Sequence, residues 1–390
     1  MKRIGVIGGG QLAWMMADAA QELGVELVVQ TPSPNDPAVA IASETIFAPV
    51  DDAAATAELA TRCDVITFEN EFVNEDALSP LAEQGVCFRP SLQALVPLLD
   101  KYHQRCYLRD LGLPQPKFVA LEEQGRGGDG EMGFPVVLKA RRHGYDGQGT
   151  FIIKDIEALK HRLEASSTKN LGRQPLFLLE EFVPFERELA VIVARSAAGK
   201  VVTYPIVETQ QQEQVCRRVL VPADISPTVA AEIEAIAHTF VNSLQAVGVF
   251  GIELFLTSAG SVLVNEIAPR THNSGHFTLD ACKTSQFEQH LRAVGGFPLG
   301  SPALCCAGAV MVNLLGYEYS QTDYLAKRQQ LGQIPQAHVH WYGKTESHPG
   351  RKLGHVTVLL DAHNHYKGSG YAGGGGVAIA RMIESIWYGC

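Results

Sequence analysis

The sequence of 390 residues lacks the features that mark several classes of protein. No apolar run is long enough to cross a membrane, and Met1-Lys2-Arg3 leads straight into a short apolar stretch without the layout of a signal peptide. An excess of positive charge is also missing. The formal net charge is −10, which argues against a broad basic surface for nucleic acid. We therefore expect a cytoplasmic protein that binds neither a membrane nor a nucleic acid.

Cysteine is scattered rather than patterned. The eight cysteines form no Cys-x-x-Cys pair, and only Cys305 and Cys306 are adjacent. This distribution is typical of reduced thiols and does not suggest a disulfide framework or a zinc site. Repeats at solenoid periods are missing too. What remains is an ordinary globular composition, with 46% apolar and 19% charged residues, and a length that predicts two or three domains.

The first hundred residues alternate strands with helices. Residues 3–7 have the pattern of a buried strand, and a helix is expected from Gln11 to about Leu23. Further strands are expected at 26–30, 64–68 and 85–88, followed by a helix over 94–111. This order predicts a doubly wound parallel sheet. Later in the chain strands predominate, interrupted by a long amphipathic helix at 226–247, and the last ninety residues are rich in strands and turns.

Two apolar strands place carboxylates close together. Glu253 lies in the first and Glu266 in the second, with a turn at Gly260 between them, so an antiparallel pair would bring both side by side. Two converging carboxylates repel each other unless a cation lies between them, and a divalent cation that binds oxygen is the natural occupant. A buried structural ion network is the alternative. The adjoining Asn265, Arg270 and His272 favour a catalytic cluster.

Other motifs suggest phosphate sites. The turn Gly8-x-Gly10-x-x-Ala13 matches a dinucleotide fingerprint, but Gln30 and Thr31 stand where its acidic residue belongs. A phosphate site is therefore credible and a nicotinamide site is disfavoured, while a tight turn without a ligand remains equally compatible. Near the end of the chain, Tyr342-Gly343-Lys344 and the basic stretch 350–355 suggest a phosphate clamp, or else a charged surface loop.

A lysine strand and an acidic strand have the layout of an ATP site. Lys139 ends the strand 134–140 and precedes a glycine-rich, basic loop suited to closing over phosphates. Glu180 and Glu188 follow in the next strands as acceptors for adenosine. His272 and His276 have a spacing that hints at zinc on a helix, but the intervening residues favour a loop.

Together these segments resemble the ATP-grasp superfamily, and within it the 5-(carboxyamino)imidazole ribonucleotide synthases of purine biosynthesis. The resemblance covers nearly the whole chain and is carried by the strings GVIGGGQLAWMM, TFENEF, KARRHGYDGQG, EEFVPFEREL, FGIELF, NEIAPRTHNSGHFT and YGKTESHPGRKLGHV. It implies an α/β fold, α+β overall, with an N-terminal doubly wound Rossmann-like domain at 1–100. An ATP-grasp domain at 101–305, with a lid subdomain at about 117–185, and a small mixed β domain at 306–390 would follow.

The resemblance implies ATP-dependent carboxylation of aminoimidazole ribonucleotide by bicarbonate, through carboxyphosphate, in a homodimer. ATP would contact Lys101, Lys139, Glu180, Glu181, Phe182, Val183, Glu188, Asn265 and Glu266. The ribonucleotide would contact Gly10, Gln11, Leu12, Glu69, Tyr145, Asp146, Lys344 and Arg351. Magnesium, or manganese in its place, would bind at Glu253 and Glu266. Arg270, His272 and Asn273 would hold bicarbonate and carboxyphosphate, and Asp146 would accept the proton of the amine.

Two alternatives lie outside this activity. Another ATP-grasp ligase, such as a formate-dependent glycinamide ribonucleotide transformylase or a biotin carboxylase, would share the ATP site but not the Tyr145-Asp146 loop or the pair Lys344 and Arg351. A non-catalytic nucleotide-binding protein of the same fold would not need to keep Lys139, Glu253 and Glu266.

Overall fold

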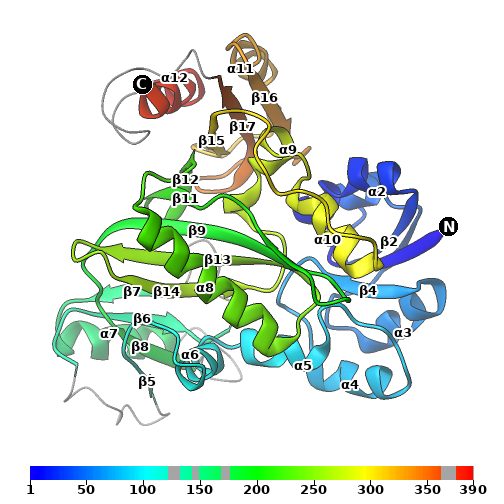
Figure 1. The fold of residues 1–390 in the computed structure, drawn as a ribbon, viewed down its shortest axis with the longest axis horizontal. Coiled ribbons are helices and arrows are strands. Elements are labelled where there is room, and N and C mark those ends of the chain that lie inside the picture. Colours follow the sequence, from blue (N-terminus) through cyan, green and yellow to red (C-terminus); the bar gives the residue numbers. More distant parts are fainter. Residues whose placement is uncertain (122–131, 143–148, 168–175, 362–374, 390) are drawn as a thin grey trace.

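The computed structural model describes residues 1–121, 132–142, 149–167, 176–361 and 375–389. Tyr145, Asp146 and the glycine-rich insertion at 125–130 lie outside these residues. The described chain forms an N-terminal part, a central part with a smaller sheet beside it, and a C-terminal part that continues the central sheet (Figure 1). None of its helices combines the length and the apolar character needed to span a bilayer.

The N-terminal part is built on a parallel sheet, as the sequence predicts. Among the described residues its strand order is β3-β2-β1-β4. The strands are β1 (Lys2–Ile7), β2 (Val25–Thr31), β3 (Glu44–Phe47) and β4 (Val65–Phe68). The expected strand at 85–88 is reduced to a single bridge between Phe88 and Ile66. The helices are α1 (Gln11–Trp14), α2 (Ala17–Leu23), α3 (Ala53–Arg62) and α4 (Glu75–Glu83).

Two expected helices are interrupted. The predicted helix from Gln11 to Leu23 is divided where the adjacent Met15 and Met16 both enter the core. The predicted helix at 94–111 becomes α5 (Leu92–Leu95), the short turn η2 (Val96–Leu98) and α6 (Lys101–Asp110). Helix α6 begins at Lys101 because the carboxylate of Asp100 accepts hydrogen bonds from the free amides of Tyr102 and His103. This cap places Lys101 in the first turn of the helix.

The central sheet has nine strands in the described part of the chain. Its path is β14-β13-β9-β11-β12-β15-β17-β16, with β10 paired to β9. The strands are β9 (Phe185–Arg195), β10 (Val201–Thr203), β11 (Val207–Gln212), β12 (Val215–Val221), β13 (Gly248–Thr257), β14 (Val262–Ala268), β15 (Gly308–Leu315), β16 (Ala337–Trp341) and β17 (Lys352–Leu360). Helix α8 (Pro227–Leu244) shares one hydrophobic core with β9, β13 and β14, in which the rings of Phe240 and Phe250 meet edge to face. The β13–β14 hairpin is thus anchored in the core of the central part.

A smaller antiparallel sheet lies next to the hairpin (Figure 1). Its order among the described residues is β5-β8-β6-β7, and its strands are β5 (Phe118–Leu121), β6 (Val136–Ala140), β7 (Thr150–Ile153) and β8 (Phe177–Glu181). Helix α7 (Ile156–Ser167) follows β7. Strand β6 carries Lys139 and β8 carries Glu180, so this sheet brings the predicted ATP residues together.

The C-terminal part extends the central sheet. Strand β15 pairs antiparallel with β12, and β17 and β16 follow at its edge. Helices α11 (Leu325–Leu331) and α12 (Gly375–Tyr388) cover this end, with Trp387 fully buried. The sequence did not predict α12. The connection from β14 to β15 contains η3 (Asn273–Gly275), α9 (Thr278–Ala281) and α10 (Gln286–Gly295). The α/β class with an N-terminal parallel sheet is confirmed.

Candidate active site

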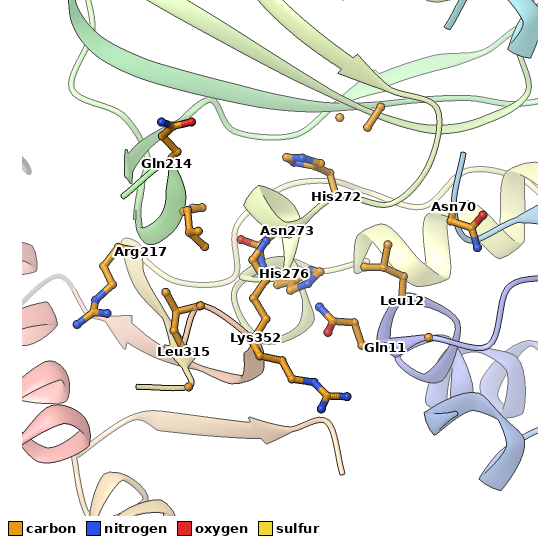
Figure 2. A pocket seen from close by; sticks show the side chains of 18 of the residues that line it. Gln11, Leu12, Asn70, Gln214, Arg217, His272, Asn273, His276, Leu315 and Lys352 are labelled. Atoms are coloured by element: carbon orange, nitrogen blue, oxygen red, sulfur yellow. The ribbon is translucent and has the colours of Figure 1, made fainter. Parts of the chain in front are cut away.

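One pocket of about 1730 Å³ lies where the three parts meet. The N-terminal part contributes Gln11 and Leu12, the central part contributes His272, and the C-terminal part contributes Lys352 (Figure 2). Other predicted site residues that line it are Gly10, Glu69, Lys101, Glu253, Glu266, Arg270, Asn273, Lys344 and Arg351. The pocket therefore gathers residues that are dispersed over almost the whole sequence.

A β-bulge arranges the acidic residues. Glu253 of β13 lies directly opposite Glu266 of β14, but the next pair is Leu254 with Val264, so Asn265 is an extra residue in β14. A bulge of this kind turns two successive side chains away from the core. The side-chain amide of Asn265 faces the Glu253 carboxylate at 3.4 Å. The expected juxtaposition of Glu253 and Glu266 is present, with Asn265 as a third oxygen-bearing group.

The two opposed carboxylates differ in their titration. Burial raises the pKa of Glu253 to about 7, and the neighbouring Glu266 charge adds to this. Burial also acts on Glu266, but the ammonium groups of Lys101 and Lys139 outweigh it and lower its pKa. Glu266 forms an ion pair with Lys101. Burial and mutual repulsion thus both disfavour two charged carboxylates at this position, and a divalent cation would relieve both effects.

The second lysine is fixed inside the protein. Lys139 is 7% exposed, and its ammonium lies 2.8 Å from Glu180 Oε2 and donates to Asn265 Oδ1 at 3.0 Å. Burial lowers the pKa of Lys139, whereas Glu180 opposes that change. The pKa of Glu180 falls to about 2 because Lys139 and Arg105 together outweigh the effect of its burial. Lys139 is thereby held between the small sheet and the hairpin.

Arg105 is a functional residue that sequence reasoning missed. Its guanidinium is 2% exposed and donates to Glu180 Oε1 at 2.6 Å and to the carbonyls of Val264 and Asn265, each at 2.7 Å. The available signal was its spacing in α6, since Lys101, Arg105 and Leu108 repeat on one helical face. Arg105 joins the strand of Glu180 to the bulge that presents Asn265 and Glu266.

The predicted adenosine residues lie around the join of β8 and β9. Val183 is buried, Phe182 is partly exposed, and the Glu181 carboxylate accepts a hydrogen bond from the Lys117 amide at 2.8 Å. Burial raises the pKa of Glu188 to about 7, and Glu253 contributes to the rise. Glu188 therefore lies in the same electrostatic environment as the carboxylate pair, and can act as a hydrogen-bond donor or acceptor near neutral pH.

The segment after β14 supplies three polar groups to the pocket. Arg270 is oriented by Glu71, whose Oε1 accepts from its Nε at 2.9 Å. His272 caps η3, where its Nδ1 contacts the Ser274 hydroxyl at 2.9 Å and accepts a long hydrogen bond from the Ser274 amide, and its Nε2 faces Glu253 Oε1 at 3.5 Å. His272 and His276 flank a short 3₁₀ turn, in keeping with the predicted loop.

Asn273 and His272 are each fixed by a residue that the sequence did not indicate. Asn273 exchanges two side-chain hydrogen bonds with the buried Asn313 of β15, at 3.0 and 2.7 Å. Gly251 of β13 lies under His272, and a Cβ there would approach the His272 Cγ to 2.7 Å. The position thus requires glycine because of the close approach.

The glycine turn of the N-terminal part encloses a carboxylate. Gly8 has a φ of 114°, and a Cβ there would lie 2.6 Å from Glu69 Oε2. The amide of Leu12 donates a long hydrogen bond of 3.4 Å to Glu69 Oε1. Burial raises the pKa of Glu69, and Arg270 opposes the rise. Glu69 and the predicted phosphate-binding amides therefore face the same part of the pocket.

Basic residues of the C-terminal part line the pocket beside the glycine turn. Lys344 donates to Gln11 Oε1 and to the Lys352 carbonyl, both at 2.8 Å, and thereby links the two ends of the chain. Arg351 donates to the Glu346 carbonyl at 2.9 Å. Lys352 also lines the pocket, although only its neighbour Arg351 was predicted (Figure 2). Lys344, Arg351 and Lys352 thus form a basic wall of the pocket.

The fold and the site together define an ATP-grasp enzyme. The family model of the ATP-grasp domain matches residues 106–287. The ribonucleotide synthetase preATP-grasp domain matches residues 1–96, and the C-terminal domain of phosphoribosylaminoimidazole carboxylase matches residues 309–367.

Relatives with known names agree with each other. The N5-carboxyaminoimidazole ribonucleotide synthase of Synechococcus elongatus is 54% identical, over 99% of this chain and 96% of its own. The crystal structure of the Thermotoga maritima synthetase, 38% identical, superposes with a TM-score of 0.83 over 99% of this chain and 98% of that one. An Aspergillus clavatus synthase in complex with ADP and 5-aminoimidazole ribonucleotide is 30% identical, with a TM-score of 0.87 over 100% and 99% of the two chains. The chain belongs to the N5-carboxyaminoimidazole ribonucleotide synthases, ATP-grasp ligases of purine biosynthesis, as its sequence motifs predict.

Proposed function

We propose that the protein uses ATP and bicarbonate to carboxylate 5-aminoimidazole ribonucleotide, forming N5-carboxyaminoimidazole ribonucleotide, ADP and phosphate. The observation that carries this proposal is the set of side chains that meet in one pocket of about 1730 Å³. The pocket is lined by the carboxylate pair Glu253 and Glu266, by His272 beside Glu253, and by Lys344 of the basic wall. Two phosphorylated substrates can thus bind around a shared centre.

The first step joins ATP to bicarbonate. A bicarbonate oxygen attacks the γ-phosphorus, the bond to the ADP oxygen breaks, and carboxyphosphate forms. Phosphoryl transfer mainly requires positioning and charge compensation. Lys101 and Lys139 would compensate the charge of the phosphates, and Arg270 and His272 would hold the bicarbonate. The adenosine would lie against Phe182 and Val183 and the neighbouring residues Glu180, Glu181 and Glu188.

The donor set at the hairpin fits a hard divalent cation. Glu253 and Glu266 provide opposed carboxylate oxygens and Asn265 an amide oxygen, which are ligands that Mg²⁺ prefers and that Mn²⁺ also accepts. Glu253, Glu266 and Asn265 would hold the ion, which would supply positive charge against the phosphates. The raised pKa of Glu253 is in keeping with this assignment, because burial and the neighbouring Glu266 charge both disfavour its ionised form and a bound cation would favour it.

The second step transfers the carboxyl group. The exocyclic amine attacks the carboxyl carbon, the bond between that carbon and the phosphate oxygen breaks, and the amine loses a proton. Arg270, His272 and Asn273 would neutralise and orient the intermediate. Lys344 and Arg351, with the amides of Gly10, Gln11 and Leu12, would hold the ribose phosphate, and Glu69 the ribonucleotide. We propose Asp146 as the proton acceptor and Tyr145 as a contact of the imidazole, although both lie outside the described residues.

ADP release tests the proposal directly. The protein is incubated with ATP and Mg²⁺, with aminoimidazole ribonucleotide and bicarbonate each added or withheld. We expect rapid ADP release only when both are present, together with an acid-labile carboxylated product. ADP release that ignores the ribonucleotide, or that requires formate instead of bicarbonate, would refute this function and favour another ATP-grasp ligase.

We also infer a cytoplasmic homodimer, in keeping with the family resemblance. Light scattering after size exclusion should give twice the mass of the 42.2 kDa chain. A monomeric mass at the concentration of the assay would contradict this inference, and fractionation of cells that express the protein tests its location.

A further inference from the structure

Three histidines and an aspartate lie together outside the catalytic pocket, in what we call the β16–β17 imidazole cluster (Asp280, His338, His340 and His355). His338 and His340 are two residues apart in β16, so their side chains share one face of the strand. His355 of β17 is the register partner of His340. Asp280 of α9 reaches both β16 imidazoles, at 2.9 Å from His340 Nε2 and 3.5 Å from His338 Nδ1.

The innermost imidazole has an unused nitrogen. His355 is fully buried, and its Nδ1 contacts the hydroxyl of Tyr342 at 2.8 Å. Its Nε2 has no hydrogen-bond partner among the described residues. A buried polar atom is normally paired, so this nitrogen indicates that a ligand is missing from its surroundings. The hydrogen bond between Asp280 and His340 does not give His355 Nε2 a partner.

We propose that the β16–β17 imidazole cluster binds a transition-metal ion, with Zn²⁺ as the best fit. One ligand atom from each of Asp280, His340 and His355 lies within 4.8 Å of the other two. His338, whose Nδ1 lies 3.5 Å from Asp280 Oδ1, must move towards these three atoms to supply a fourth ligand. Imidazole nitrogens with one carboxylate oxygen are ligands typical of Zn²⁺ and unsuited to Mg²⁺. The tyrosine contact on His355 is the type of outer hydrogen bond that orients metal-ligating imidazoles.

Metal binding requires the ligand atoms of the cluster to move closer together. Zinc bonds of about 2.0–2.1 Å place tetrahedral ligand atoms about 3.3–3.4 Å apart. The rings of His340 and His355 are stacked with centroids 4.5 Å apart and planes 16° from parallel, so they must tilt for their lone pairs to converge. Such a tilt uses the soft outer torsion of histidine. His338 is the most exposed member and offers the ion a route from solvent.

The metal would connect two parts of the molecule. Asp280 belongs to the segment that follows the catalytic turn with Asn273, whereas the imidazoles belong to the C-terminal hairpin β16–β17. A shared ion would cross-link these segments without contacting Glu253 or Glu266. The proposed role is therefore structural, and the binding can be measured without any assay of turnover.

Metal analysis of the untagged full-length protein tests the proposal. The protein is stripped with a chelator, dialysed against excess Mg²⁺ to occupy the carboxylate pair, and equilibrated with Zn²⁺. We expect about one equivalent of Zn²⁺ to be retained by the wild type and by His238→Ala, a control at an exposed histidine of α8. Asp280→Asn and the exposed-site variant His338→Ala should bind at least about tenfold more weakly.

Cobalt identifies the ligands. Bound Co²⁺ should give visible absorption bands of a tetrahedral nitrogen–oxygen site, and these bands should disappear in Asp280→Asn. A thiolate charge-transfer band would instead place the ion at the nearby Cys282, Cys305 and Cys306 and overturn the proposal. Wild-type protein that retains no more Zn²⁺ than the folded Asp280→Asn and His338→Ala variants would overturn it as well.

Discussion

Glu253 and Glu266 have the same chemical group but different charge states near neutral pH. With its pKa raised to about 7, Glu253 of the metal-free protein is largely neutral below that pH, whereas Glu266 with its lowered pKa stays ionised. Protons therefore compete with a divalent cation at Glu253. We predict that the Mg²⁺ concentration for half-maximal activity falls as the pH rises from 6 to 8, by up to about tenfold per pH unit below the pKa.

This pH dependence is measured by titrating Mg²⁺ into assays at fixed concentrations of the substrates. A carboxyl group whose pKa is raised by folding stabilises the folded protein below its ordinary pKa, and this contribution is lost as the pH rises to the raised value. Metal-free protein should therefore also lose stability as the pH rises towards 7, and Mg²⁺ should restore it. A Mg²⁺ requirement that does not vary over this pH range would contradict the assignment of Glu253.

Glu266 allows a simpler test. Glu266→Ala removes one proposed metal ligand and the partner of Lys101, so turnover should fall by at least about 100-fold while the protein stays folded. Glu186→Ala is the control, because that glutamate is exposed and pairs only loosely with Arg187. Circular dichroism establishes folding and ADP release measures turnover. Near-normal activity of Glu266→Ala would exclude it from the metal site.

At the scale of the element, Arg105 in α6 connects the small sheet to the β13–β14 hairpin. Arg105→Met leaves Glu180 with only Lys139 and leaves two carbonyls of β14 unpaired, so we expect a loss of about 3–5 kcal/mol in the free energy of unfolding. Arg109→Met in the same helix removes an exposed ion pair with Asp110 and should cost less than about 1 kcal/mol.

Urea denaturation of both variants compares the two sites under the same conditions. Equal losses in Arg105→Met and Arg109→Met would mean that the buried hydrogen bonds of Arg105 contribute little to stability.

Gly251 of β13 controls the position of His272. Gly251→Ala introduces a methyl group against the imidazole, so we predict a loss of about 1–3 kcal/mol in stability and a larger loss of kcat than the stability change explains. Gly133→Ala is the matched control because nothing lies within 4 Å of its added Cβ. If Gly251→Ala keeps the wild-type kcat, the exact placement of His272 is unimportant for turnover.

The hairpin illustrates what a sequence can predict. Its alternating apolar residues and the turn at Gly260 are local, so the opposition of Glu253 and Glu266 followed from the pattern. The buried positions of β14 change from a spacing of two residues to a spacing of three between Val264 and Ile267. This change of spacing in the apolar residues indicates the bulge, although the bulge was not predicted from it. The partners Arg105, Asn313 and Glu71 come from elements far away in the sequence, and no local pattern shows which elements will pack together.

At the scale of the whole molecule, Lys344 connects the C-terminal part to Gln11 at the opposite end of the chain. Lys344→Met should raise the KM for the ribonucleotide by about 10- to 100-fold, the value of a hydrogen bond to a charged group, and leave the KM for ATP unchanged. Lys200→Met, at an exposed lysine away from the pocket, is the control. An equal rise in the KM of both substrates would mean that Lys344 supports the pocket as a whole.

The arrangement of the domains could be predicted only in part. The order of the three parts follows from motifs that stand in sequence order, whereas the way they meet does not. The predicted boundary between 305 and 306 falls on a connection whose two sides contribute neighbouring strands, β12 and β15, to one sheet. That pairing depends on strands separated by α8, the hairpin and α10, so the continuous sheet had no local signal.

The β12–β15 pairing has a practical consequence for dividing the gene. A chain cut between α10 and β15 would leave one fragment with the open edge of β12 and the other with the open edge of β15, each exposing unpaired amides and carbonyls. Separately, such edges invite aggregation. Expressed together, the same edges are complementary in register, from Arg218 opposite Val312 to Val221 opposite Ala309. The sheet thus offers a site for a split enzyme whose activity would report the reunion of its two halves.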